Sequence, residues 1–181
     1  TVPGTNAGLD FGPQPVAGTY TVVAEDVATG CQRNMTGSLA VSISALPVVY
    51  TVTGGGNYCA GSAGLHVYLS GSASGILYQL YHNGSAMGAS KAGTGSALDF
   101  GVLTAGGNYT VVATNPATAC KSNMTGSATI TVNGLPNVHT VSSAGSVTSY
   151  CAGTGGVEIL QSNSDFGIRY QLLRGSSFVG L

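Results

Sequence analysis

The chain has 181 residues, of which 5 are Lys or Arg and 6 are Asp or Glu, so its formal net charge is -1. Charged residues make up 6% of it, against roughly a quarter in ordinary soluble domains. This composition argues against a basic surface for nucleic acid or anionic lipid, and no apolar run reaches the roughly 18 residues of a membrane-spanning helix.

Residues 1–46 are predicted to be the C-terminal half of a β-rich repeat. Residues 8–47 recur as residues 97–136, shifted by 89 positions, with 20 of 40 positions identical. Both copies contain Gly-x-Tyr-x-Val-x-Ala, whose alternation indicates a strand. Tyr20 and Tyr109 open this strand, where a tyrosine resembles the tyrosine corner of immunoglobulin-like sandwiches, whose hydroxyl binds nearby backbone. The alternative is an aromatic residue present only for its β propensity.

Residues 47–135 are predicted to be a complete repeat. Alternating polarity indicates four strands, at Leu65–Leu69, Tyr78–Tyr81, Tyr109–Ala113 and Ala128–Val132. Turn signals separate them at His82-Asn83-Gly84, Ala105–Asn108 and Thr114-Asn115-Pro116, and no stretch has helical period or caps. About seven short strands in about 90 residues is the pattern of an immunoglobulin-like sandwich. The expected fold class is all-β, made of tandem immunoglobulin-like β-sandwich repeats.

Residues 136–181 are predicted to be the N-terminal half of the next repeat. Tyr58-Cys59-Ala60-Gly61 recurs as Tyr150-Cys151-Ala152-Gly153, shifted by 92 positions. The two shifts together equal the chain length. If Leu181 is joined to Thr1, the sequence that runs across the join matches residues 78–101 without a gap. We therefore expect this sequence to be a two-repeat stretch of a longer protein, cut inside a domain and continued by further copies.

Pro47 and Pro136 each follow a leucine between predicted repeats. Proline fixes φ and removes a backbone donor, so each linker is expected to be short and stiff. The repeats are therefore expected to lie end to end as a rod.

The four cysteines fall at two repeated positions. Cys59 and Cys120 are 61 residues apart, and the same spacing is expected from Cys151 to the next counterpart of Cys31. This equality predicts one disulfide per repeat, Cys59 with Cys120, while Cys31 and Cys151 pair with cysteines of adjoining repeats in an oxidising, extracytoplasmic setting. An ordinary sandwich would place the two cysteine positions at opposite ends of the domain. A disulfide between neighbouring domains and free thiols therefore stay open as alternatives. No C-x-x-C or His spacing accompanies a cysteine, which argues against zinc.

No catalytic constellation is predicted. The carboxylates are scattered and no two recur together across the repeats: Asp10, Glu25, Asp26, Asp99, Glu158 and Asp165. Asp10 and Asp99 hold the same place in Leu-Asp-Phe-Gly, which indicates a structural role at a strand end or turn. His66, His82 and His139 are replaced by other residue types where a second copy exists, so solvent-facing positions are expected for all three.

Gly54-Gly55-Gly56 and Gly93–Ser96 lack the following Lys-Ser/Thr or the strand-to-helix setting of a phosphate loop, and are expected to be turns. The acidic residues are too few for a calcium site of the EF-hand kind. We therefore expect no enzymatic activity, no cofactor and no metal site.

The expected surface is uncharged and rich in Thr, Ser and Ala. Natural sandwiches often guard edge strands with Lys or Pro, but Lys91 and Lys121 are the only lysines here. Lateral or end-to-end self-association into filaments is therefore a hypothesis. The other expected partners are neighbouring repeats of the same chain and external surfaces or polysaccharide; nucleic acid and membrane insertion are not expected.

As a set, several motifs resemble a known repeat class: Tyr-Cys-Ala-Gly, Tyr-Gln-Leu, Gly-Ser-Ala-Leu-Asp-Phe-Gly, Ala-Gly-x-Tyr-Thr-Val-Val-Ala-Thr-Asn and Met-Thr-Gly-Ser-Ala-Thr-Ile-Thr-Val. Over essentially its whole length the chain is similar to the tandem Ig-like repeats of giant Bacteroidota cell-surface proteins, such as the SprB-type gliding-motility adhesins exported by type IX secretion. The resemblance implies a long extracellular fibre at the cell surface, with the repeats as its stalk. It implies no catalytic residue, and it does not show that this protein serves gliding.

The leading functional hypothesis is a structural repeat of an extracellular fibre or adhesin stalk. The alternative is a carbohydrate- or surface-binding module of a secreted protein. Stacking on sugars needs exposed aromatic residues on one face, but the chain has no Trp, and Leu173 replaces Tyr81 in the next copy. A third hypothesis, an accessory domain of a secreted enzyme, requires a catalytic module outside this sequence.

Overall fold

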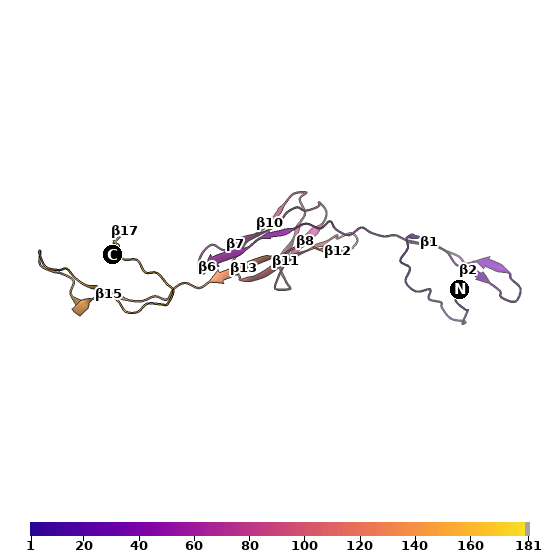
Figure 1. Ribbon diagram of the computed structural model, residues 1–181. Coiled ribbons are helices and arrows are strands. Elements are labelled where there is room, and N and C mark those ends of the chain that lie inside the picture. The colour runs from indigo at the N-terminus through magenta and orange to yellow at the C-terminus, as the bar shows by residue number, and fades with distance from the viewer. Residues whose placement is uncertain (180–181) are drawn as a thin grey trace.

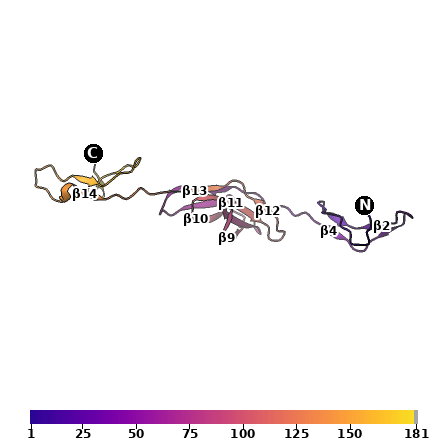
Figure 2. The ribbon, with the colours of Figure 1, turned by 90° about the horizontal axis from the view of Figure 1, so that it is seen from below.

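The computed structural model describes residues 1–179, and the fold is all-β, as predicted. Figure 1 shows a folded middle part with a thinner segment extending from each of its ends, and Figure 2 shows the same arrangement from a perpendicular direction. We call these parts the middle unit (47–135), the N-terminal segment (1–46) and the C-terminal segment (136–179). Within residues 1–179 the only helix is a 3-10 turn at Ala144–Ser146 (η1), and no helix there has the length and apolarity to cross a membrane.

Two sheets form the middle unit. The first has the order β10-β7-β5, with strands Leu98–Leu103 (β10), Leu65–Leu69 (β7) and Val52–Gly54 (β5). The second has the order β6-β13-β11-β8-β9, and β12 also pairs with β11. Its strands are Gly56–Cys59 (β6), Leu77–His82 (β8), Ser85–Ala92 (β9), Gly107–Thr114 (β11), Lys121–Asn123 (β12) and Ala128–Asn133 (β13). Every pair of neighbours is antiparallel except β6 and β13, which are parallel.

The hydrophobic core lies between these two sheets. On β11 the side chains of Tyr109, Val111 and Ala113 are buried, and the residues between them are only partly so. This period of two is the pattern of a strand with one face against a core. Buried residues of β5, β7 and β10 meet those of β8, β11 and β13 in one hydrophobic cluster. The middle unit is therefore a two-layered β structure.

The four strands predicted from alternation are confirmed as β7, β8, β11 and β13. The predicted turn at His82-Asn83-Gly84 is also confirmed: β8 and β9 are joined through Asn83 and Gly84, whose φ values are 49° and 83°. Positive φ at both central residues is the two-residue hairpin turn that Asn-Gly favours.

Strands β9 and β10 were not predicted. The sequence of β9, SAMGASKA, is mostly small and exposed, so it has no alternating pattern. In β10 the pairing with β7 shifts between Asp99 and Val102, where Gly101 has φ of 91°. This bulge breaks the period of two by which a strand is recognised.

Gly54, Gly55 and Gly56 carry the chain from the first sheet to the second. Strand β5 ends at Gly54, strand β6 begins at Gly56, and the three φ values are 99°, 74° and 123°. Only glycine adopts such values readily. A Cβ on Gly55 would also collide with the carbonyl oxygen of Thr129. The run predicted as a turn is therefore a crossing between two sheets.

We expect Gly55→Ala to destabilise the middle unit by about 2 kcal/mol, because it combines a left-handed φ with a backbone clash. Gly75→Ala is the matched control, since Gly75 has φ of 81° and no atom within 4 Å of the added Cβ. The control is expected to cost only about 1 kcal/mol. Chemical denaturation measures both, and equal losses would contradict a clash at Gly55.

The N-terminal segment repeats two ladders of the middle unit. Strand β1 (Gly18–Tyr20) pairs with β4 (Leu39–Val41), and β2 (Val23–Glu25) pairs with β3 (Gln32–Asn34). Each residue pair has its counterpart 89 positions later, in the β11–β13 and β11–β12 ladders. The register is therefore the same in both copies.

The C-terminal segment repeats two other ladders. Strand β14 (Val141–Ser143) pairs with β15 (Ile159–Gln161), and β16 (Leu173–Arg174) pairs with β17 (Ser177–Phe178). Their counterparts are the β5–β7 and β8–β9 ladders, again in the same register. The three additional residues of this copy lie around η1, at the place of the three-glycine crossing.

The outer segments contain strands without a core. Every buried residue in the described part of the chain lies within 47–130. In the outer segments the counterparts of core residues are exposed: Ile159 is 54% exposed where Val67 is 0%, and Met35 is 42% exposed where Met124 is 6%. The reason is that each segment has only one half of the repeat, whereas the β7–β10, β8–β11 and β6–β13 ladders join the two halves.

Candidate functional site

Tyr109 makes the hydrogen bond expected of a tyrosine corner. Its side chain is fully buried, and its hydroxyl donates to the carbonyl of Ala105 at 2.7 Å. Tyr20 donates to the carbonyl of Val16, also at 2.7 Å. The bond recurs in a segment that has no core because donor and acceptor are only four residues apart. Each bond joins the tyrosine to the loop that precedes its strand, β11 or β1.

Burial raises the pKa of Tyr109 above its ordinary value of 10.0, and the nearby hydroxyl of Tyr58 adds to this shift. The folded state therefore holds the phenol proton more tightly than the unfolded chain does. The resulting stabilisation is complete below about pH 10 and is lost as the pH rises through the pKa of the folded state. We expect this group to lower the free energy of unfolding by at most about 1.4 kcal/mol per pH unit above about pH 10.

Tyr109→Phe tests this assignment by equilibrium unfolding at neutral and alkaline pH. At neutral pH the variant should be less stable by about 1 kcal/mol, because the Ala105 carbonyl loses its donor. Its stability should then fall less steeply above about pH 10, because the phenol is gone. Tyr20→Phe should change neither quantity for the middle unit. An unchanged alkaline slope in Tyr109→Phe would contradict the prediction.

His66 and Asp99 form a hydrogen-bonded pair on the neighbouring strands β7 and β10. Nδ1 of His66 lies 2.8 Å from Oδ2 of Asp99, and the imidazole stacks on Tyr68. The hydrogen bond from His66 lowers the pKa of the Asp99 carboxyl. That carboxylate also accepts from the backbone N–H of Gly101 at 2.7 Å, as Asp10 does from Gly12 at 2.8 Å. The carboxylates therefore have a structural role at the bulge or turn, and only the copy in the middle unit has a histidine partner.

The other two histidines also contact protein groups. Nε2 of His139 lies 3.3 Å from Oδ1 of Asp165, whose pKa is lowered mainly by a hydrogen bond from Asn137. His82 stacks on Tyr109 at 4.6 Å between ring centres. The expected solvent-facing position fits His66, whose side chain is 39% exposed, whereas the His139 side chain is only 12% exposed. Sequence reasoning missed Asp99 and Asp165 as partners because they lie 33 and 26 residues from His66 and His139.

Neither His–Asp pair extends to a larger cluster. Among residues 1–179 no three His, Cys, Asp or Glu side chains gather in a way that could hold a metal ion. The two pairs lie in different parts of the chain, one in the middle unit and the other in the C-terminal segment.

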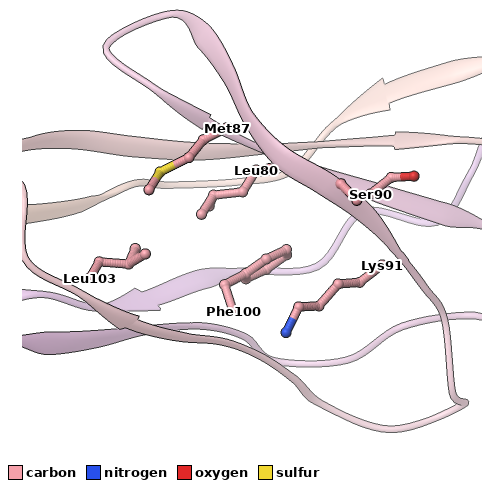
Figure 3. A pocket seen from close by; sticks show the side chains of 8 residues that line it. Leu80, Met87, Ser90, Lys91, Phe100 and Leu103 are labelled. Carbon is pink, nitrogen blue, oxygen red and sulfur yellow. The ribbon is translucent and has the colours of Figure 1, made fainter.

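An open cavity of about 390 Å³ lies between the β8–β9 hairpin and β10 (Figure 3). Leu80, Met87, Phe100 and Leu103 supply apolar side chains, and Lys91 lies beside Phe100. Nζ of Lys91 donates to the carbonyl of Asp99 at 2.7 Å, so the one cation of this lining already has a protein partner.

The cavity lining is not repeated along the chain. The counterpart of Lys91 is Val2, and the counterpart of Met87 is Val179. A ligand that needed the ammonium group or the long thioether would bind one repeat and not the next. The cavity is therefore a weaker candidate than features that recur.

The features that recur are the strand registers, the tyrosine corners and the cysteine positions. No family model, curated protein or solved structure matches this chain.

The junctions between the middle unit and the outer segments contain the predicted linker prolines. Pro47 is buried and Pro136 is exposed. Figure 1 shows β12 at the end of the middle unit that faces the N-terminal segment, and β6 with β13 at the end that faces the C-terminal segment. The chain therefore enters the middle unit at one end and leaves it at the other.

The predicted disulfide between Cys59 and Cys120 is not formed, and all four cysteines are free. Cys59 pairs with Asn133, which is five residues along β13 from Ala128, the partner of Tyr109. Six residues beyond Tyr109, Asn115 donates its N–H to the carbonyl of Cys120. At about 3.3 Å per residue this path separates the two cysteines by about 36 Å, whereas a disulfide needs Cα atoms within about 7 Å. The sandwich topology places them at opposite ends.

Proposed function

We propose that the chain is a stretch of tandem Ig-like repeats from an extracellular fibre or adhesin stalk at the cell surface, arranged end to end as a rod. The observation behind this proposal is that the same strand pairings occur in all three parts of the chain. Each ladder in the N-terminal and C-terminal segments has a counterpart in the middle unit in the same register. The resemblance in sequence to the repeats of giant surface proteins supports the same proposal.

The strand order of the middle unit is suited to tension along the chain. Strand β6, near the start of the unit, pairs in parallel with β13, its last strand, over four residue pairs. A parallel bridge between Thr51 and Thr125 lies on the same path. Because parallel strands carry their chain termini in opposite directions, a pull on both ends slides β6 along β13. The hydrogen bonds between them then resist together and do not open one after another.

The composition supports a passive role. With charged residues at 6% of the chain, the surface offers few groups for general acid–base chemistry. The non-recurring cavity lining disfavours the alternative of a carbohydrate-binding module, since a binding repeat would keep its contacts from copy to copy. The proposed function is therefore that of a passive stalk that spans distance, with neighbouring repeats as partners.

Single-molecule pulling on the chain, anchored at both termini, tests this function. Thr125→Pro removes the N–H that donates to the carbonyl of Tyr50 at 2.9 Å, on the path between the first and last strands. We expect this variant to unfold at lower force than the parent chain. Thr36→Pro, at the counterpart position in the N-terminal segment, should leave the force of the middle unit unchanged.

An unchanged force in Thr125→Pro would contradict the proposal, because the terminal strands would then carry no tension. A glycan array probed with the same chain provides the second arm. Saturable binding to one sugar class would favour the binding module over the stalk.

A further inference from the structure

We propose that successive repeats are joined by a disulfide between the Cys59-type cysteine of one repeat and the Cys120-type cysteine of the next. This inference depends on the proposed function, because it requires that complete repeats follow one another. It assigns a covalent site to each junction between repeats.

The first observation is that Cys120 faces the preceding part of the chain. Its Sγ lies 4.0 Å from the carbonyl oxygen of Ser44 in the N-terminal segment, although the two residues are 76 positions apart. Cys120 is the half-buried member of the four cysteines. Its thiol is thus held against the last residues of the segment that precedes the middle unit.

The second observation concerns what lies beside Ser44 in a complete repeat. The counterpart of Ser44 in the middle unit is Asn133, 89 positions later. Asn133 pairs with Cys59 in the β13–β6 ladder, and its carbonyl accepts from the N–H of Ala60 at 2.8 Å. In a complete repeat, the Cys59-type cysteine therefore lies next to the residue at the position of Ser44.

Together these observations place two thiols near the position of Ser44. One is the Cys59-type thiol of the same repeat, and the other is the Cys120-type thiol of the next repeat. Paired strands lie about 4.8 Å apart, so the Cys59-type cysteine is one strand away from Ser44, whose carbonyl Cys120 already contacts. A disulfide needs Cα atoms about 4.4 to 6.8 Å apart. Both contacts involve the same carbonyl position, because the Asn133 carbonyl accepts from Ala60 and the Ser44 carbonyl faces Cys120. The two cysteines are therefore placed on the same side of the strand, where that range can be met, whereas the 36 Å path within a repeat cannot meet it.

Both kinds of cysteine have the same local setting wherever they occur. Cys31 accepts from the N–H of Asp26 at 2.9 Å, as Cys120 does from Asn115. Cys151 accepts from the N–H of Thr154 at 3.1 Å, as Cys59 does from Ser62. The backbone around each of the two cysteine positions is therefore the same in both copies.

The chemistry is an ordinary two-electron oxidation. Two thiols lose two protons and two electrons as the S–S bond forms, and an oxidised disulfide compound accepts them and is reduced to two thiols. In an extracytoplasmic setting a disulfide-donating oxidoreductase supplies this oxidant, and in the test tube oxidised glutathione does so.

The bond would limit how far a fibre can extend. Without it, an unfolded repeat extends over the 92 residues between Cys59 and Cys151; with it, the path from one repeat to the next contains only the 61 residues between the two cysteine types. The staple also fixes the angle at each junction beside the linker proline. It therefore adds stiffness and a stop to extension.

The test uses the 181-residue chain and a tandem chain of two copies joined end to end, each oxidised with glutathione and analysed by thiol counting and disulfide mapping. The single chain contains no complete pair of neighbours, so all 4 thiols should stay free. The tandem chain has eight cysteines, and four should remain free. The other four should form two links, Cys59 of the first copy with Cys31 of the second, and Cys151 of the first with Cys120 of the second.

Three results would overturn the inference: a Cys59–Cys120 link in the single chain, links within repeats of the tandem chain, or eight free thiols in a tandem chain that is folded by calorimetry. Cys59→Ser in the first copy is the control, and it should remove one link and leave the other. If the tandem chain formed no additional folded unit, the proposed repeat architecture would be contradicted instead. The unfolding enthalpy measures this outcome independently of the thiol count.

Discussion

Joining two copies of the chain end to end is expected to triple, and not only double, the calorimetric enthalpy of unfolding. The single chain has one core, which lies within 47–130. A unit of about 90 residues contributes roughly 60 kcal/mol to the enthalpy near 60 °C. The tandem chain would contain two middle units and a third unit, formed by the C-terminal segment of the first copy and the N-terminal segment of the second.

The expectation of a third unit follows from complementary halves. The C-terminal segment contains the counterparts of β5, β7, β8 and β9, and the N-terminal segment contains those of β11, β12 and β13. Apolar residues that are exposed in these segments, such as Ile159, Tyr170, Val22 and Met35, would occupy the positions of buried residues. Burial of this surface is the driving force for folding that neither half has alone.

Differential scanning calorimetry of the single and tandem chains measures the ratio. Ile159→Asp provides the matched control, because Ile159 is 54% exposed in the single chain but has the counterpart Val67, which is 0% exposed. In the first copy of the tandem chain the substitution should reduce the ratio from three to two. In the second copy, where the segment stays open, it should have no effect. A ratio of two for the unsubstituted tandem chain would refute complementary halves.

Sequence patterns predicted the parts of the fold that depend on local periodicity. Strands such as β11 bury alternate side chains, so Tyr109, Val111 and Ala113 mark them in the sequence. The bond between Tyr109 and Ala105 spans four residues and was also predictable. Repetition added the register, because a shift of 89 or 92 positions places each ladder of an outer segment on a ladder of the middle unit.

The remaining features depend on contacts between distant residues. Asp99 lies 33 residues from His66, and only the pairing of β10 with β7 brings them together. The crossing at Gly54–Gly56 could be recognised as a turn, but not as a change of sheet. The equal spacing of the cysteines fitted a bond within a repeat as well as one between repeats. The β6–β13 register was needed to argue against a bond within a repeat.

Met124→Ala is expected to destabilise the middle unit by about 3.5 kcal/mol, because it removes a buried side chain and leaves a cavity. Met124 is 6% exposed, and its sulfur lies 3.3 Å from the backbone nitrogen of Tyr50. In a domain of this size the loss should lower the melting temperature by roughly 15 °C. Met35→Ala is the matched control, since the same residue type is 42% exposed in the N-terminal segment, and it should cost less than about 0.5 kcal/mol.

The two methionines also link this prediction to the tandem chain. Met35 of the second copy would be enclosed in the third unit, at the position that Met124 has in the middle unit. Its substitution by alanine should then cost about 3.5 kcal/mol, while the same change in the first copy stays neutral. If Met35→Ala destabilised the single chain as much as Met124→Ala, the N-terminal segment would have a core of its own. If it were neutral in both copies of the tandem chain, the two halves would not have combined.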